Sequence, residues 1–243
     1  MSIRSARSAV AFLTIIPVAD PSGHAGERLG RAYFPAVGAL LGFVAGLTMV
    51  VVSTFTTRLV GAAAALTVLA VVTGGLHLDG LADTADGLFG GGDRERRLEI
   101  MRDPRIGSFG AVALVLVLLM DVATLASITP PRALLSLVVA GTLSRWAMLW
   151  LVALLPYARP QGLGTAAAGG HRVFDLVLGS LFAGLACLLD WRSAVIAVLL
   201  VAVMTIGVAI FAKSRIGGAT GDVYGATVEL CQLAVFVAFA VHL

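Results

Sequence analysis

Acidic side chains are concentrated in one short polar stretch of an otherwise apolar chain. Seven of the fourteen Asp and Glu residues fall within residues 79–103. Asp79, Asp83 and Asp86 are spaced by four and then three residues, so a helix would place their carboxylates on one face. Such close like charges repel, and a hard cation such as Mg²⁺, which takes carboxylate and phosphate oxygens, would offset the repulsion. The spacing predicts a metal site that handles a phosphate-bearing substrate.

Five arginines follow these carboxylates. The planar guanidinium donates paired hydrogen bonds to phosphate oxygens, which makes arginine a frequent phosphate ligand. The residues are Arg94, Arg96, Arg97, Arg102 and Arg105. Carboxylates, a divalent cation and arginines in one segment indicate phosphoryl-transfer chemistry. The alternative is a solvated loop between two helices, held by salt bridges among the same charges.

A second polar cluster precedes the last apolar run. Its glycine-rich turn leads into a predicted helix, whose free backbone N–H groups and positive dipole end favour an anion. The side chains expected to bind phosphate there are Lys213, Arg215 and Thr220. Asp222 and Glu229 are seven residues apart and would share a helix face, with Glu229 inside the membrane. We expect both at the metal site. The alternative is an interfacial Asp222 and a Glu229 paired to a neighbouring arginine.

Two basic residues need partners. Arg145 lies near the middle of an apolar run, where an unpaired guanidinium costs roughly 2.5–3.5 kcal/mol. Its partner is either Asp121, in a structural pair, or the acidic site, which a long side chain could reach. His77 lies one turn before the carboxylates and could orient a phosphate, although a lone histidine at a helix end is commonly structural.

The composition excludes an ordinary soluble domain. The 243 residues are 59% hydrophobic and 13% charged, and the mean hydropathy is +0.98. We predict an all-α polytopic membrane helical bundle of about seven transmembrane helices, forming one integral-membrane domain over residues 1–243. The apolar runs are 36–55, 59–78, 108–128, 132–155, 174–189, 193–211 and 226–243. Glycines at every fourth position of the first run should allow close helix packing.

The N-terminal segment, residues 1–35, superficially resembles a secretory signal peptide, because two arginines precede a short apolar run that ends at Pro17. Cleavage there would place Arg28 and Arg31 outside the cell, against the charge distribution of the rest of the chain. We therefore expect an uncleaved amphipathic or re-entrant helix at the cytoplasmic membrane interface.

Lys and Arg are unevenly distributed between the two ends of the predicted bundle. Thirteen of the seventeen lie on the side of the N-terminus and the acidic stretch, if all seven runs cross. Cytoplasmic loops carry this excess, so the N-terminus and residues 79–107, a predicted catalytic loop, should be cytoplasmic and the C-terminus outside. The isoelectric point near 9.3 has the same explanation. We expect membrane lipid as a partner, and no nucleic acid.

Three long motifs carry a family resemblance. They are GGLHLDGLADTADG at 74–87, LEIMRDPRIG at 98–107, and GGATGDVYGA at 217–226 followed by Glu229. FLTIIP at 12–17 and the Ser144-Arg145 pair extend the likeness over nearly the whole chain. The sequence resembles the cobalamin synthases, which are adenosylcobinamide-GDP ribazoletransferases.

The resemblance implies a Mg²⁺-dependent transferase of cobalamin biosynthesis in the bacterial cytoplasmic (inner) membrane. Such an enzyme joins adenosylcobinamide-GDP to α-ribazole, or to its 5′-phosphate, and releases GMP. We expect the metal ligands to be Asp79, Asp83, Asp86, Asp222 and Glu229. Either Asp83 or Asp222 would also accept the proton of the attacking ribose hydroxyl. Arg102 and Arg105 would bind phosphates, and Arg145 would stabilise the leaving GMP.

Other functions are consistent with parts of the sequence. Residues 83–87 distantly resemble CDP-alcohol phosphotransferases, but residues 88–91 stand where that family has an Ala-Arg pair, so its residue roles are not transferred. A lipid-forming phosphotransferase would release CMP instead of GMP. A transporter would spread its charges along several spans. A membrane scaffold would tolerate loss of Asp79, Asp83 and Asp86 together. A homo-oligomer is compatible with the sequence.

Overall fold

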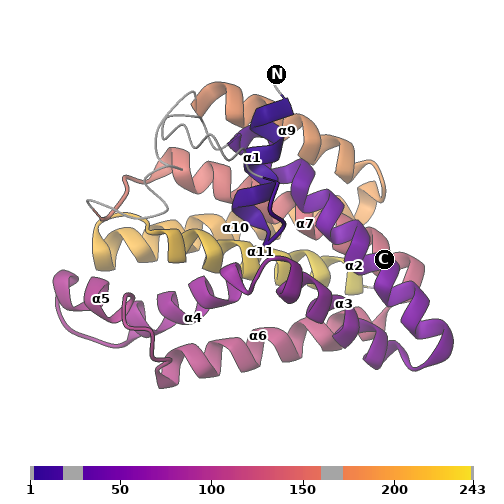
Figure 1. Cartoon of the computed structure of the whole chain (residues 1–243), viewed down its shortest axis with the longest axis horizontal. Helices are drawn as coiled ribbons and strands as arrows, with labels where there is room; N and C mark the ends of the chain where they lie inside the picture. Colours follow the sequence, from indigo (N-terminus) through magenta and orange to yellow (C-terminus); the bar gives the residue numbers. More distant parts are fainter. Residues whose placement is uncertain (1–2, 19–29, 160–171, 242–243) are drawn as a thin grey trace.

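The computed structural model describes residues 3–18, 30–159 and 172–241 (Figure 1). Within these ranges the chain is helical and has no β-strand. The helices are α1 (Ile3–Leu13), the 3-10 turn η1 (Arg31–Tyr33), α2 (Phe34–Phe55), α3 (Arg58–Val72), α4 (Leu76–Phe89), α5 (Arg94–Ile100), α6 (Ser108–Ser127), α7 (Pro130–Leu154), α9 (Arg172–Cys187), α10 (Trp191–Ile216) and α11 (Gly221–Ala240). The all-α prediction is confirmed.

Five of these helical segments are long and apolar enough to cross a membrane. They are η1 with α2, α6, α7, α10 and α11. Helices α3 and α4 are long and apolar enough to cross a membrane only when taken together as one segment, and they are bent by 89° relative to each other. Within the described residues the bundle therefore has five spanning helices, or six with the bent pair. The predicted polytopic helical bundle is confirmed.

The bend between α3 and α4 interrupts the run predicted at 59–78. Gly74 and Gly75 adopt φ values of +62° and +70°, which L-residues with a side chain rarely adopt. The chain turns at these glycines, and α4 begins afresh at Leu76. Residues 79–107, predicted as a catalytic loop, are therefore mostly helical. They comprise the rest of α4, the whole of α5 and short connections.

One end of the bundle is tied together by Arg132. Its Nε donates to the Phe239 carbonyl at 3.0 Å, and a terminal nitrogen donates to Ser193 Oγ at 3.0 Å. The start of α7, the start of α10 and the end of α11 therefore lie side by side.

The opposite end of the bundle is tied together by Arg94. This residue begins α5, and it donates to the carbonyls of Ile216 at 2.9 Å and Ala158 at 2.7 Å. The end of α10 and the segment after α7 therefore lie beside α5. Because α7 ends here and α10 begins at the other end, the connection that contains α9 must pass from one end to the other. Helix α9 has 16 residues, fewer than the roughly 20 that a helix needs to cross a membrane.

Helices α7 and α11 form the centre of the bundle, since 72% and 78% of their most apolar stretches are buried inside the protein. Helix α2 packs on α7 through glycines. A Cβ at Gly38 would clash with the Gly141 carbonyl, and a Cβ at Gly42 would clash with the Leu137 carbonyl. The close approach predicted from the glycine spacing is confirmed.

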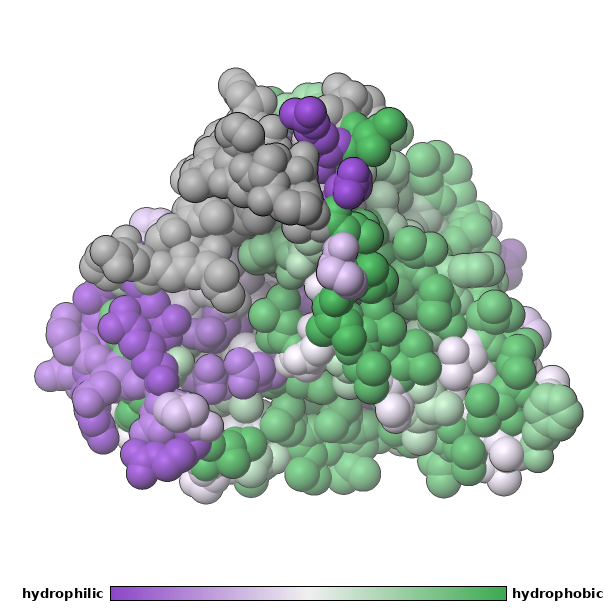
Figure 2. All heavy atoms as spheres, in the orientation of Figure 1, coloured by the Kyte–Doolittle hydropathy of each residue, from purple (hydrophilic) through white to green (hydrophobic). Residues whose placement is uncertain are grey.

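Polar and apolar surfaces are separated along the molecule. Figure 2 shows hydrophilic residues gathered at the left end, over α5 and the connections beside it, and apolar residues over most of the right. Large exposed hydrophobic side chains on α2, α6 and α10 belong to the apolar part. At the top, α1 packs on α2, with the Phe12 and Phe34 rings stacked at 5.5 Å. Residues 19–29 of the predicted interfacial segment lie outside the described residues.

Candidate active site

Helices α4 and α11 meet at backbone contact. A Cβ at Gly80 would lie 2.8 Å from the Asp222 carbonyl oxygen and 3.1 Å from the Gly225 Cα. A Cβ at Gly225 would lie 3.2 Å from the Gly80 Cα. Any side chain at either position would push the helices apart, so this pair of glycines sets their distance. The contact brings the carboxylates of α4 to the first turn of α11.

Three carboxylates converge there, and we refer to Asp79, Asp83 and Asp222 as the acidic group. Asp79 and Asp222 line the same cavity. Asp83 is near enough for the charges of both to act on it. Asp79 is exposed, whereas Asp83 and Asp222 are partly buried. The structure therefore brings together acidic residues from two segments that are far apart in the sequence.

Arg159 balances part of this negative charge. A terminal nitrogen of its guanidinium lies 2.8 Å from Asp222 Oδ2, and the arginine side chain is only 11% exposed. The same nitrogen donates to the Met101 carbonyl at 3.3 Å. Thr220 Oγ1 also donates to Asp222 Oδ2, at 3.2 Å. Asp222 is thus held in place by two donors.

A short backbone pairing positions Arg159. The Ala158 N–H donates to the Ala219 carbonyl at 2.8 Å, and the Ala219 N–H donates to the Pro156 carbonyl at 2.9 Å. A Cβ at Gly218 would clash with the Pro156 carbonyl, so this pairing requires glycine there. The sequence did not predict a role for Arg159, because its partner comes from a distant segment and no local spacing links the two.

Two cavities border the acidic group. The narrow chamber has a volume of about 410 Å³, and its walls come from α1, α4, α7, α11 and the segment after α7. The wide chamber has a volume of about 930 Å³ and lies between α1, α4, α6 and the segment after α5. Phe12, Leu76 and Asp79 line both chambers. A ligand in each chamber could therefore meet its neighbour at Asp79.

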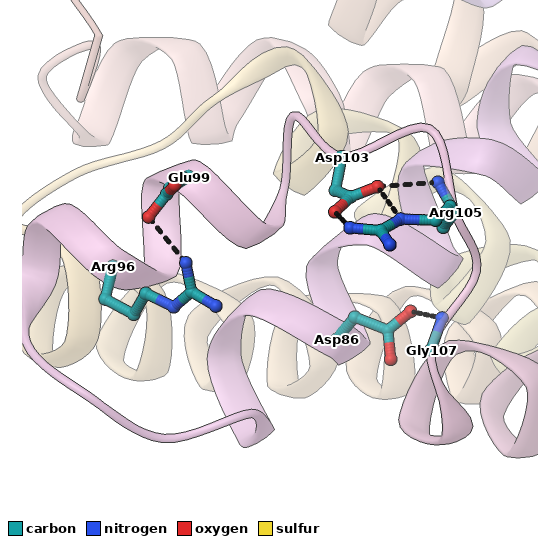
Figure 3. Close-up of polar contacts among 6 residues, drawn as sticks. All are labelled: Asp86, Arg96, Glu99, Asp103, Arg105 and Gly107. Carbon is teal, nitrogen blue, oxygen red and sulfur yellow. Dashed lines mark hydrogen bonds and ion pairs between the residues drawn. The ribbon is translucent and has the colours of Figure 1, made fainter.

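Asp86 does not point into either chamber. Its Oδ2 accepts from the Gly107 N–H at 2.8 Å (Figure 3). Its Oδ1 accepts from the Gly110 N–H at 2.9 Å. Both oxygens therefore cap the first turn of α6, whose free N–H groups and dipole favour a carboxylate. Within the part of the chain that the structure describes, no three His, Cys, Asp or Glu side chains could hold a metal ion by themselves.

Glu229 lies deeper in the bundle, in what we call the interior cluster: His77, Asp121, Arg145, Glu229 and Gln232. These side chains are almost fully buried and surround a cavity of only about 20 Å³. Arg145 donates to Ser144 Oγ at 3.0 Å and to Gln232 Oε1 at 3.4 Å, and it lies 3.4 Å from His77 Nδ1. The hydrogen bonds of Arg145 thus link α7 to α11, and neither predicted alternative describes its contacts fully.

The five arginines after the carboxylates have different environments. Arg94 and Arg97 donate to backbone carbonyls, Arg97 to that of Gly87 at 3.2 Å. Arg96 pairs with Glu99 at 2.7 Å on the exposed face of α5 (Figure 3). These three residues have structural contacts.

Arg102 and Arg105 follow α5. Arg105 pairs with Asp103 through two hydrogen bonds of 2.6 and 2.9 Å (Figure 3). These bonds lower the pKa of the Asp103 carboxyl to about 2, so it stays charged near neutral pH. Arg102 is exposed and lines the wide chamber together with Asp83 and Asp103. Arg102 is the arginine of this segment best placed to meet a phosphate there.

Three residues before α11, Lys213, Arg215 and Thr220, were predicted to bind an anion. Lys213 and Arg215 are exposed on the last turn of α10, and the Arg215 guanidinium lies 5.1 Å from the Phe211 ring centroid. Thr220 is buried and caps α11 by accepting from the Val223 N–H at 3.3 Å. Of the three, Thr220 touches the acidic group, through Asp222.

The chain is similar to known proteins over nearly its whole length. The family model described as cobalamin-5-phosphate synthase matches residues 5–240. The adenosylcobinamide-GDP ribazoletransferase of Rhizobium etli is 40% identical over 252 residues, which cover 97% of this chain and 95% of the relative. Those of Azorhizobium caulinodans and Pseudomonas putida are also 40% identical, over 97% of this chain and 94% and 98% of the relatives. No solved structure matches the chain.

Proposed function

Because the chain belongs to the cobalamin-5-phosphate synthase family, we propose that it joins adenosylcobinamide-GDP to α-ribazole, or to α-ribazole 5′-phosphate, and releases GMP. The product is adenosylcobalamin or its 5′-phosphate. The observation that carries this proposal is the contact of α4 with α11 at Gly80 and Gly225, which assembles the acidic group between two chambers. A two-substrate reaction needs such a junction.

The reaction transfers a substituted phosphate. A ribose hydroxyl oxygen of the acceptor bonds to the phosphorus on the cobinamide side of the diphosphate, and the bond from this phosphorus to the bridging oxygen breaks. GMP leaves with that oxygen. The hydroxyl proton passes to a carboxylate, for which Asp83 is better suited than Asp222. Asp222 already accepts from Arg159 and Thr220, whereas Asp83 lines the wide chamber.

The acidic group fits Mg²⁺. This ion is commonly held by one or two carboxylates together with substrate phosphates and water, so it does not require three protein ligands. Asp79 and Asp83, one helical turn apart, would supply those carboxylates. When bound, the ion would offset the charge that builds up on the diphosphate oxygens during transfer. Asp86 and Glu229 face other partners, so we do not include them among the ligands.

Two arginines border the reaction site. Arg102 in the wide chamber would bind phosphate oxygens of the donor as it enters. Arg159, held against Asp222, would keep that carboxylate from repelling the diphosphate. Arg145 lies within the interior cluster and would act on the site only through His77, its neighbour on α4.

We also propose a place in the cell. The end of the bundle that carries the acidic group also carries the five arginines of α5 and the segment after it, and the opposite end carries Arg58, Arg132 and Arg192. The excess of positive charge favours the cytoplasm for the first end. Lipid of the bacterial inner membrane would cover the apolar surface.

An assay of the detergent-purified protein tests the function. Adenosylcobinamide-GDP and α-ribazole are supplied with Mg²⁺, and cobalamin and GMP are measured together. We expect the two products in equal amounts, and a loss of both after EDTA that added Mg²⁺ restores. A CDP-activated lipid that yields CMP under the same conditions, without GMP from the corrinoid, would contradict the proposal. The same preparation with α-ribazole 5′-phosphate identifies the preferred acceptor.

A further inference from the structure

The two chambers that meet at Asp79 differ in chemistry as well as size. The wall of the narrow chamber is made largely of apolar and aromatic side chains, among them Phe12, Leu13, Met148 and Tyr224. Its charged groups are Asp79, Asp222 and Arg159, on the side where α4 meets α11. A ligand in this chamber would have an apolar part surrounded by protein and a polar part at the carboxylates.

The narrow chamber is firmly built. Tyr157 and Tyr224 lie on one side of it, with ring centroids 6.5 Å apart. Phe12 is fixed from behind by its stack on Phe34, and Met148 on α7 is only 3% exposed. A volume of about 410 Å³ lies within the range of roughly 300–1,000 Å³ usual for small-ligand sites. The chamber therefore suits a nucleoside-sized molecule.

The wide chamber has a different character. It is more than twice as large, at about 930 Å³, and Arg102, Asp103 and Asp83 lie along it. One wall carries Ile106, which is 59% exposed. A bulky ligand could therefore rest here with only its end inside the protein.

The two substrates differ in the same way. The base of α-ribazole is a planar benzimidazole with two methyl groups and no exocyclic N–H or C=O on its edge. Guanine carries such groups along one edge, and burying them without partners would cost free energy. The corrinoid is much larger than a nucleoside and carries many amides.

We propose that the narrow chamber binds the base of the acceptor, and that the corrinoid donor approaches through the wide chamber. This assignment rests on the proposed function. It places the acceptor ribose at Asp79, where the two chambers adjoin, and the donor diphosphate between Asp83 and Arg102. Met148, Leu13 and Phe12 are then specificity-determining residues, because their apolar side chains enclose the base without hydrogen-bonding to an edge.

The test compares two matched substitutions. Met148→Phe adds a ring to the narrow chamber, and Leu114→Phe adds one to the wide chamber. We expect Met148→Phe to weaken α-ribazole binding and raise its KM by about tenfold or more, as overpacking does, with little change in the donor KM. Leu114→Phe should raise the donor KM instead. Val115→Phe, on the exposed face of α6, is the control and should change neither.

Calorimetric titration of the purified full-length protein with α-ribazole alone provides a readout independent of turnover. Met148→Ala, which enlarges the chamber, covers the case in which the larger residue prevents folding. It should weaken α-ribazole binding and improve acceptance of benzimidazole ribosides with bulkier substituents. If the Met148 variants change the donor KM or GMP inhibition and leave α-ribazole unaffected, the assignment is overturned. A wild-type protein that binds α-ribazole and yields no cobalamin would instead count against the proposed function.

Discussion

The acidic group and the interior cluster are built from similar residues, but the two regions differ in what those residues can contact. The acidic group, with its partner Arg159, and the interior cluster each combine carboxylates with one arginine, and each is built where α4 faces α11. Asp222 and Glu229 are two turns apart on α11, one in each region. The acidic group borders chambers of about 410 and 930 Å³, whereas the interior cluster encloses about 20 Å³. The difference shows that depth along the same pair of helices separates residues that can meet a substrate from residues that hold the bundle together, with His77 at the boundary because it lines both the narrow chamber and the small cavity.

The partners of the two arginines show the same contrast. Arg159 reaches its carboxylate, Asp222, from a connection outside the helices, and the pair lies at the chamber edge. Arg145 comes from the centre of α7 and bonds to Gln232 and Ser144. The interior cluster surrounds a cavity of only about 20 Å³, so it has no room to exchange these contacts for a ligand of substrate size.

The difference between the two regions is tested most directly by one isosteric substitution in each of them. Asp83→Asn removes the carboxylate that we assign as proton acceptor, so kcat should fall at least about 100-fold, in line with the loss of a general base. Glu229→Gln, in the interior cluster, should reduce kcat far less. GMP release at saturating substrate measures both, with circular dichroism as the check on folding. Equal losses in the two variants would mean that the regions act as one site.

A second prediction concerns stability. Arg145→Met removes a buried guanidinium together with its hydrogen bonds to Ser144 and Gln232, so the free energy of unfolding should fall by about 3 kcal/mol. Unfolding in mixed detergent micelles measures this, and the folded fraction should keep its KM for both substrates. A large drop in kcat at unchanged stability would instead place Arg145 in the reaction.

The glycine contact between α4 and α11 supports both regions, so its disruption should affect both. Gly80→Ala puts a Cβ 2.8 Å from the Asp222 carbonyl. We expect a loss of about 1–3 kcal/mol in stability, as in overpacked cores, and a lower kcat because Asp222 is displaced. Gly207→Ala is the matched control, since a Cβ there meets nothing within 4 Å. Wild-type behaviour of Gly80→Ala would show that the spacing is not critical.

The smallest effect is expected at Asp86, three residues after Asp83. Asp86→Asn keeps one acceptor oxygen for the α6 cap and loses the other, so stability should fall by about 1 kcal/mol. Turnover should stay close to that of the wild type, in contrast to Asp83→Asn. A thermal shift and the GMP assay on the same two preparations measure the difference. A loss of turnover as large as that of Asp83→Asn would mean that Asp86 acts together with the acidic group.

Much of the architecture followed from local patterns. Apolar runs about twenty residues long predict membrane helices because backbone polar groups in lipid must be paired within the helix. The glycines of α2 predicted close packing, and the structure confirms it at Gly38 and Gly42. The break at Gly74 and Gly75 was missed, because hydropathy is continuous across it.

The site residues followed from the sequence only in part. Helical spacing put Asp79, Asp83 and Asp86 on one face, but the start of α6 takes both oxygens of Asp86 as a cap. Spacing also grouped Asp222 with Glu229, although the two lie at different depths. Arg159 carried no local signal, because its role depends on the backbone pairing of 156–158 with Ala219.

By itself the sequence determined the membrane bundle and the segments in which acidic and basic residues gather, since these depend on composition and short-range periodicity, and its long motifs indicated the family by resemblance. Only the tertiary structure decided which carboxylates share a cavity and which arginine faces them. The physical reason is that a charge takes its role from its depth and its partners, and both are set by contacts between helices that are distant in the chain.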